Sequence, residues 1–169
     1  MKDTTQLYIY PASHAREHGE LEQYRASYQA NIACKEAIEQ AIADHYRDNH
    51  LDIEAVHQVS AQFGYDRLFY VLANTVRQKD FDGRISRDNK AWAKTVPVYE
   101  NPDGFGCDRN VYFVVNRSHP GLLDLFLTLA RKEYALAQEK KPSVRDSLNK
   151  NSRQQAGAEK PKQHKSLER

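Results

Sequence analysis

One stretch of the sequence, Glu20 to Asp48, constrains the fold more than any other because it can form a single long helix. It contains no Gly or Pro and is rich in Ala, Glu and Gln, which lose little conformational freedom in a helix. At about 100° per residue, its larger apolar side chains fall on one broad arc: Leu21, Tyr24, Tyr28, Ile32, Ile38, Ile42 and Tyr46. The stretch therefore predicts a long helix with a strongly apolar face.

A second arc of the same helix, roughly opposite the first, carries small side chains: Ala26, Ala30, Ala33, Cys34, Ala37 and Ala41. Small residues let another element approach closely, and a helix with two non-polar faces is usually central. We therefore expect the other helices to cover both arcs. On this interpretation a bulky residue at Ala33 or Ala37 unfolds the domain by overpacking.

The segments that follow predict shorter helices. Residues 52–64 and 65–79 each carry apolar residues at helical spacing, and Gly64 is suited to end the first of these helices. Ser86 can cap a further short helix, and Pro120 suits the first turn of the last one. Two β-like runs lie between these helices, and the turn-rich segment that joins them predicts a hairpin near Val96 to Val115.

The predicted fold class is therefore mainly α. We expect a compact bundle of about five helices around one long central helix, with a small β-hairpin as a minor α+β component. Residues 1–136 are predicted to form a single globular domain. Residues 137–169 lose the apolar periodicity, and we expect them to be a basic, disordered tail or a linker.

The net charge of +2 conceals opposite charges in two parts of the chain. Residues 131–169 contain 11 Lys or Arg and 5 Asp or Glu, whereas residues 1–130 contain 14 and 18. The basic tail suits a polyanion such as nucleic acid, although a solvated linker is the simpler interpretation. The sequence shows no signal-peptide pattern and no stretch of transmembrane length, so we expect a cytoplasmic protein without membrane contact.

A polar segment after the predicted third helix is the candidate binding site. It gathers Arg84, Arg87, Asn89, Lys90, Trp92 and Lys94 within a few residues. Arginines bind phosphates or carboxylates, an Asn can read a base edge, and a Trp can stack on a base. The simpler interpretation, which the sequence favours, places Trp92 in the core, uses Asn89 as a helix cap and leaves the basic residues solvated.

Other residues with reactive side chains do not form a recognisable motif. His14 and His18 have the i, i+4 spacing of helical zinc ligands, but the sequence shows no third ligand. Cys34 is interpreted as a small core residue. An enzyme site would have to be assembled from Arg25, Glu36, His57 or Asp82, and their spacing does not support one. We therefore expect no catalytic residue, no metal and no cofactor.

Three long segments carry a family resemblance: YPASHAREHGELEQYRASYQANIACKEAIEQAI, YDRLFYVLANTVRQKDFDGRISRDNKAWAKTVPV and SHPGLLDLFL. With these segments, most of the chain from Tyr10 to Leu129 resembles the uncharacterised bacterial domain-of-unknown-function family 3849. The resemblance implies a setting in the bacterial cytosol, as part of a conjugative or phage-like mobile genetic element. It implies no activity and no site residues.

The sequence thus leads to one hypothesis and three alternatives. The hypothesis is a non-enzymatic interaction module of a mobile element that binds a protein partner. The first alternative is an inhibitor of a host defence protein, such as a CRISPR or restriction component, because an acidic body can mimic nucleic acid. The second is a nucleic-acid-binding accessory protein that uses Arg84–Lys94 and the basic tail, and the third is an enzyme with an unrecognised site.

Overall fold

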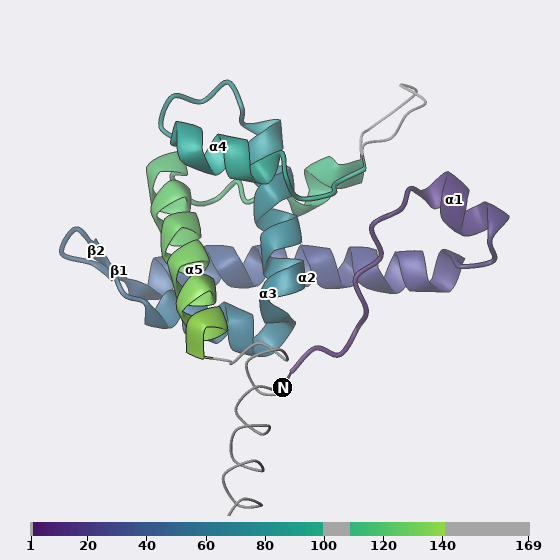
Figure 1. The fold of residues 1–169 in the computed structure, drawn as a ribbon, viewed down its shortest axis with the longest axis horizontal. Coiled ribbons are helices and arrows are strands. Elements are labelled where there is room, and N and C mark those ends of the chain that lie inside the picture. The colour runs from purple at the N-terminus through teal and green to yellow at the C-terminus, as the bar shows by residue number, and fades with distance from the viewer. Residues whose placement is uncertain (1, 100–108, 141–169) are drawn as a thin grey trace, which may run out of the picture. The chain divides into compact units, whose positions relative to one another are not determined.

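The computed structural model describes residues 2–99 and 109–140 of the chain. The described part contains five α-helices, one 3-10 helix and two short strands (Figure 1): α1 (Ala12–Glu17), α2 (Leu21–His45), β1 (Tyr46–Arg47), β2 (His50–Leu51), α3 (Glu54–Gln78), α4 (Arg87–Ala93), η1 (Arg109–Phe113) and α5 (Pro120–Lys140). The chain divides into two compact units, Met1–Arg131 and Lys132–Arg169. The predicted mainly helical fold with a small hairpin is confirmed.

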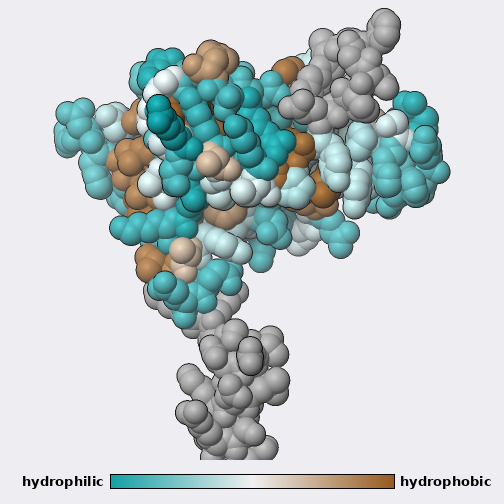
Figure 2. All heavy atoms as spheres, turned by 45° about the horizontal axis from the view of Figure 1, so that its top comes forward, coloured by the Kyte–Doolittle hydropathy of each residue, from teal (hydrophilic) through white to brown (hydrophobic). Residues whose placement is uncertain are grey.

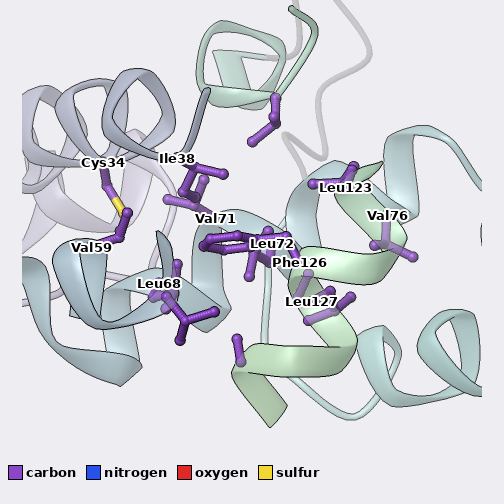
Figure 3. Close-up of a cluster of buried hydrophobic side chains, with 14 of the residues drawn as sticks. Cys34, Ile38, Val59, Leu68, Val71, Leu72, Val76, Leu123, Phe126 and Leu127 are labelled. Atoms are coloured by element: carbon purple, nitrogen blue, oxygen red, sulfur yellow. The ribbon is translucent and has the colours of Figure 1, made fainter. Parts of the chain in front are cut away.

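The core of the first unit is formed by α2, α3 and the first turns of α5. Figure 3 shows apolar side chains of the three helices pointing toward one another, among them Cys34 and Ile38 of α2, Leu68, Val71 and Leu72 of α3, and Leu123, Phe126 and Leu127 of α5. All of these are fully buried. Each large apolar side chain that is removed from water contributes about 1.5–3 kcal/mol to folding, so this cluster provides much of the stability of the unit.

The small-residue arc of α2 is only partly covered, which corrects the expectation for Ala33. Ala30, Cys34 and Ala41 are buried, whereas Ala26 and Ala33 are exposed. The buried and the exposed small residues form two neighbouring rows along the helix, and α3 covers only the row of Ala30, Cys34 and Ala41. A bulky side chain at Ala33 would therefore extend into solvent instead of overpacking a core.

Gly64 interrupts α3 where the sequence predicted a helix end. Its backbone angles, φ 80° and ψ 160°, are not helical, and the helix axis kinks there. An L-residue rarely adopts a positive φ, so glycine is required at this position. The two predicted helices thus exist, joined end to end as the two halves of α3.

The hairpin lies between α2 and α3, because β1 pairs with β2 in antiparallel register, Tyr46 with Leu51. The turn residues Asp48 and Asn49 have φ values of 53° and 62°. Two consecutive positive φ angles fit the type I′ turn, which Asn and Asp tolerate better than most residues. The prediction that the long helix continues to Asp48 is therefore too long by three residues, since α2 ends at His45.

The hairpin predicted near Val96 to Val115 is wrong in location. Residues 96–99 are irregular, residues 109–113 form η1, and residues 100–108 lie outside the described part. Side chains of α3 bind the backbone groups that a strand partner would use. Arg77 donates to the carbonyl oxygens of Val96 (2.9 Å) and Val98 (3.2 Å), and Thr75 Oγ1 accepts from the amide of Val115 (3.1 Å).

The predicted domain boundary at residue 136 falls inside α5, which is helical to Lys140. The division into units comes earlier, after Arg131. The predicted tail beyond residue 140 lies outside the described residues. Across the described helices, none combines the length and the apolar character that crossing a membrane requires.

Candidate functional site

A pocket lined by tyrosines lies between the N-terminal segment, the start of α2 and the region around η1. Six of the ten tyrosines of the chain line it: Tyr8, Tyr10, Tyr24, Tyr28, Tyr70 and Tyr99. The other lining residues include Phe113, Asn31, Asn110 and Arg16. Its volume is about 180 Å³, smaller than the roughly 300–1,000 Å³ of typical small-molecule sites. The pocket therefore suits one ring or one side chain better than a whole cofactor.

The rings in this pocket are arranged as a buried floor and an exposed rim. Tyr70 and Phe113 form the floor, where they stack at 5.8 Å between ring centres and are almost fully buried. Tyr10 and Tyr99 form the rim, where they are 44% and 48% exposed and lie 5.6 Å apart. A partner group would thus meet exposed polar hydroxyls at the rim and buried aromatic surface below.

The wall between floor and rim is made of rings in edge-to-face contact. Tyr8 lies nearly perpendicular to Tyr24, at 6.2 Å, and to Tyr10, at 5.8 Å. Edge-to-face pairs are favoured because the positive ring edge meets the negative ring face. The same geometry lets the wall accept a further aromatic ring or a proline ring from outside.

A buried arginine holds the segments that carry these wall residues in place through hydrogen bonds. Arg67 of α3 donates through Nη1 to the carbonyl oxygen of Ser27 (2.9 Å) and to Oδ1 of Asn31, and through Nη2 to the carbonyl oxygen of Thr5 (3.1 Å). The Ser27 hydroxyl in turn accepts from the amide of Tyr8 (2.9 Å). Arg67 thus ties α3, α2 and the N-terminal segment together, and its burial lowers the pKa of its guanidinium.

The electrostatic surroundings of Tyr8 perturb its phenol. Burial and the negative charge of Glu20 raise its pKa, and its hydroxyl donates to Glu20 Oε1 at 3.4 Å. A phenol with a raised pKa stays protonated at neutral pH, so Tyr8 acts as a hydrogen-bond donor and not as a base or nucleophile. Burial likewise raises the pKa of the Cys34 thiol to about 12, which confirms it as an inert core residue.

Two histidines stand beside the rim. His14 stacks on Tyr10 with 4.4 Å between ring centres, and His18 stacks on His14 with 4.0 Å. Glu20 lies next to them, with Oε1 3.9 Å from His14 Nε2. The sequence showed no third ligand for the histidine pair, because Glu20 reaches the pair only through the turn at Gly19.

Some side chains of the predicted binding segment, residues 84–94, are buried and form hydrogen bonds within the protein. Asn89 is buried and donates to Asp124 Oδ1 (2.8 Å) and Thr128 Oγ1 (3.0 Å), while its own oxygen accepts from Arg131 (2.8 Å). These bonds fasten α4 to α5. The Ser86 cap of α4 is confirmed, since its hydroxyl accepts from the amide of Asn89.

The aromatic and basic residues of that segment do not converge on a common surface feature. Trp92 packs edge-to-face on Phe69 (5.3 Å), and the Arg131 guanidinium covers its ring. Arg84 binds Asp82 through two hydrogen bonds of 3.0 and 2.8 Å, which hold the pKa of Asp82 well below its usual range. Arg87 and Lys94 are exposed, and Lys90 is half-buried. The segment therefore offers basic charge without the stacking and base-reading residues.

The residues considered for an enzyme lie apart from the tyrosine pocket. Glu36 lines a different hollow, beside Glu39 and His119. His57 pairs with Glu54 at 3.2 Å on α3. None of Arg25, Glu36, His57 and Asp82 lines the tyrosine pocket. The sequence signal that would have pointed to the pocket is the density of tyrosines in residues 8–28.

These features define a class: a small helical domain whose most distinctive surface feature is an aromatic pocket beside the N-terminal half of α2. A family model described as "protein of unknown function (DUF3849)" matches residues 7–135. The chain therefore belongs to this family. The comparisons matched it to no curated protein and to no solved structure.

Proposed function

We propose that this domain is a non-enzymatic interaction module that binds a protein partner through the tyrosine-lined pocket. The observation that carries the proposal is the pocket itself, in which six tyrosines and Arg16 converge from four separate segments. Tyr and Arg are enriched at the energetic centres of protein interfaces. Tyr buries a large area at low entropic cost and keeps a polar end, and Arg adds several hydrogen-bond donors in a fixed planar geometry.

The partner group that suits the pocket is a single ring-bearing side chain, aromatic or proline. The volume of about 180 Å³ holds one such group, and the perpendicular wall rings accept it edge-to-face. Figure 2 shows a face on which hydrophobic residues are exposed only in small separate patches. An anchor that enters a pocket fits such a surface better than a broad apolar interface.

The proposal assigns no reaction to the pocket. The Tyr8 phenol, whose pKa is raised, is protonated at neutral pH. The other lining groups are tyrosine phenols, the Ser13 hydroxyl, amides, apolar side chains and the Arg16 guanidinium. General acid–base work needs a group that changes its charge near neutral pH. Such a group is not among the residues known to line the pocket.

The setting that we propose, a bacterial mobile genetic element in the cytosol, is the one that the family resemblance implies. Within it, the partner could be a host defence protein, since residues 1–130 carry four more acidic than basic residues and acidic surfaces can occupy nucleic-acid sites. Genes next to family members would test the setting: neighbours without mobility functions would contradict it.

Selection from a phage-displayed peptide library tests the pocket directly. The full chain, immobilised through its N-terminus, should enrich peptides with one recurring aromatic or proline residue. A Tyr10→Ala/Tyr99→Ala chain should lose this enrichment, because both rim rings are removed. The matched control is Tyr134→Ala, which removes an exposed tyrosine that does not line the pocket.

Equal enrichment by the rim variant and the wild type would overturn the proposal. So would salt-sensitive binding of labelled single-stranded DNA or RNA that is abolished by Arg87→Glu/Lys94→Glu and unaffected by the rim variant. That result would instead support the nucleic-acid alternative and the segment from Arg84 to Lys94.

A further inference from the structure

We propose that His14, His18 and Glu20 form a binding site for one divalent transition-metal ion of the zinc class. The two imidazoles and the carboxylate each offer one ligand atom, and these atoms lie within 4.8 Å of one another. The proposal does not depend on what the tyrosine pocket binds.

The chemistry of the donors selects the class of metal. Two imidazole nitrogens with one carboxylate oxygen are typical ligands of Zn²⁺ and its late first-row neighbours Co²⁺, Ni²⁺ and Cu²⁺. Ca²⁺ and Mg²⁺ prefer a shell of oxygens. Three protein ligands leave a fourth position open, and the exposure of His18 lets solvent occupy that position.

The backbone turn explains how three ligands come together. His14 and His18 lie one helical turn apart at α1 and its C-cap. Gly19 then adopts φ 69°, and the amide of Glu20 donates to the carbonyl oxygen of Ala15 (2.7 Å). This reversal brings the Glu20 carboxylate back to the histidines, 3.9 Å from His14 Nε2.

A hydrogen bond sets the tautomer of His18 that metal binding requires. Nδ1 of His18 lies 2.9 Å from the carbonyl oxygen of His14. A carbonyl oxygen can only accept, so Nδ1 carries the proton and Nε2 keeps its lone pair. Metal-ligating histidines typically donate their second nitrogen to a carbonyl or carboxylate in this way.

The carboxylate is oriented in a comparable manner. Tyr8 donates its hydroxyl proton to Glu20 Oε1 at 3.4 Å, and ligating carboxylates are commonly held by such outer hydrogen bonds. Neighbouring ligands of a tetrahedral zinc lie about 3.3 Å apart. The ligand atoms, now within 4.8 Å of one another, therefore have to move closer, and the stacked imidazole rings have to tilt apart, for the three groups to close around an ion.

Titration calorimetry of the full chain with ZnCl₂ tests the proposal. We expect one strong site per chain, and binding should weaken as the pH is lowered, because protons compete with the metal for the imidazole nitrogens. His14→Gln and Glu20→Gln should each weaken binding at least tenfold. The matched control is His50→Gln, an exposed histidine on the hairpin, and His164→Gln controls for the C-terminal histidine.

A second readout separates this site from adventitious binding. Zn²⁺ should raise the melting temperature of the wild type and of the two control variants, and not that of His14→Gln. Co²⁺ bound to the wild type should show the intense visible absorption of a tetrahedral site. The proposal is overturned if His14→Gln and Glu20→Gln bind Zn²⁺ like the wild type, if no binding occurs up to millimolar Zn²⁺, or if Mg²⁺ competes equally.

Discussion

Replacing Arg67 by methionine should destabilise the domain more than any exposed charge change, because solvent cannot replace the hydrogen bond that the buried Asn31 side chain loses. Arg67 is 2% exposed and Asn31 is 3% exposed. The methionine keeps most of the side-chain volume and removes the donors to Ser27, Asn31 and Thr5.

The expected cost follows from which acceptors are left without a donor. The carbonyl oxygen of Thr5 is near the surface and can bind water, and that of Ser27 retains its place in the α2 hydrogen-bond ladder. Oδ1 of Asn31 is the acceptor that loses its buried donor, and an unpaired buried acceptor costs about 1–3 kcal/mol of stability. Loss of the hydrogen bonds from the charged guanidinium costs about as much again. Releasing the guanidinium from a site whose burial lowers its pKa offsets a part. We expect a net loss of about 3 kcal/mol.

Urea denaturation followed by far-UV circular dichroism measures this loss, with the slope of the transition as a check on two-state behaviour. The control is Arg25→Met, an exposed arginine on α2, which should change stability by less than about 0.5 kcal/mol. In the double variant Arg67→Met/Asn31→Leu the losses should be less than additive by about 1–3 kcal/mol. An Arg67→Met chain within about 0.5 kcal/mol of the wild type would refute the reasoning.

Three further outcomes are expected. Gly19→Ala should destabilise by about 1 kcal/mol and weaken Zn²⁺ binding, because a Cβ at φ 69° strains the turn although it meets no neighbouring atom; unchanged thermal unfolding and calorimetry would contradict this. Ala33→Phe should remain within about 0.5 kcal/mol of the wild type, whereas Ala41→Phe, at a fully buried position, should lose about 1–3 kcal/mol or more in urea titrations; equal losses would show that Ala33 is covered. Arg84 lowers the pKa of Asp82 in the folded state. The carboxylate therefore adds stability that is fully present above its unfolded-state pKa of about 3.9 and is lost as the pH falls toward its folded-state pKa. Melting temperatures measured from pH 6 to 2 should fall less steeply below about pH 4 in Asp82→Asn than in the wild type, and parallel profiles would contradict this.

The elements that depend on local sequence could be predicted. Gly64 at the kink of α3, the Ser86 cap of α4 and Pro120 at the start of α5 all act through their own backbone or their nearest neighbours. The apolar face of α2 could also be predicted, because helical periodicity alone places Ile38 and Ile42 on the same side of the helix. The small-residue face was not, since composition cannot say that α3 covers Ala30 and leaves Ala33 in water.

The wrong predictions concern segments whose structure depends on contacts with residues far away in the sequence. The β-like run ending at Tyr99 has strand propensity, but Arg77 binds the carbonyl oxygens of Val96 and Val98 from α3. Asn31 is buried and is paired by Arg67, 36 residues away, which no local sequence pattern identifies. The tyrosine pocket joins residues from position 8 to position 113, and no spacing rule connects them.

The buried network and the two proposed sites are parts of one arrangement. Arg67 holds Thr5 and Ser27, and Ser27 holds the amide of Tyr8. Tyr8 then contributes one wall of the pocket and orients the carboxylate of Glu20. Preorganised walls reduce the entropy that a partner or a metal ion must overcome on binding. Loss of Arg67 should consequently weaken peptide selection and Zn²⁺ binding together, even under conditions in which the chain remains folded. If either activity persisted at full strength in a folded Arg67→Met chain, that site would be organised independently of the network behind it.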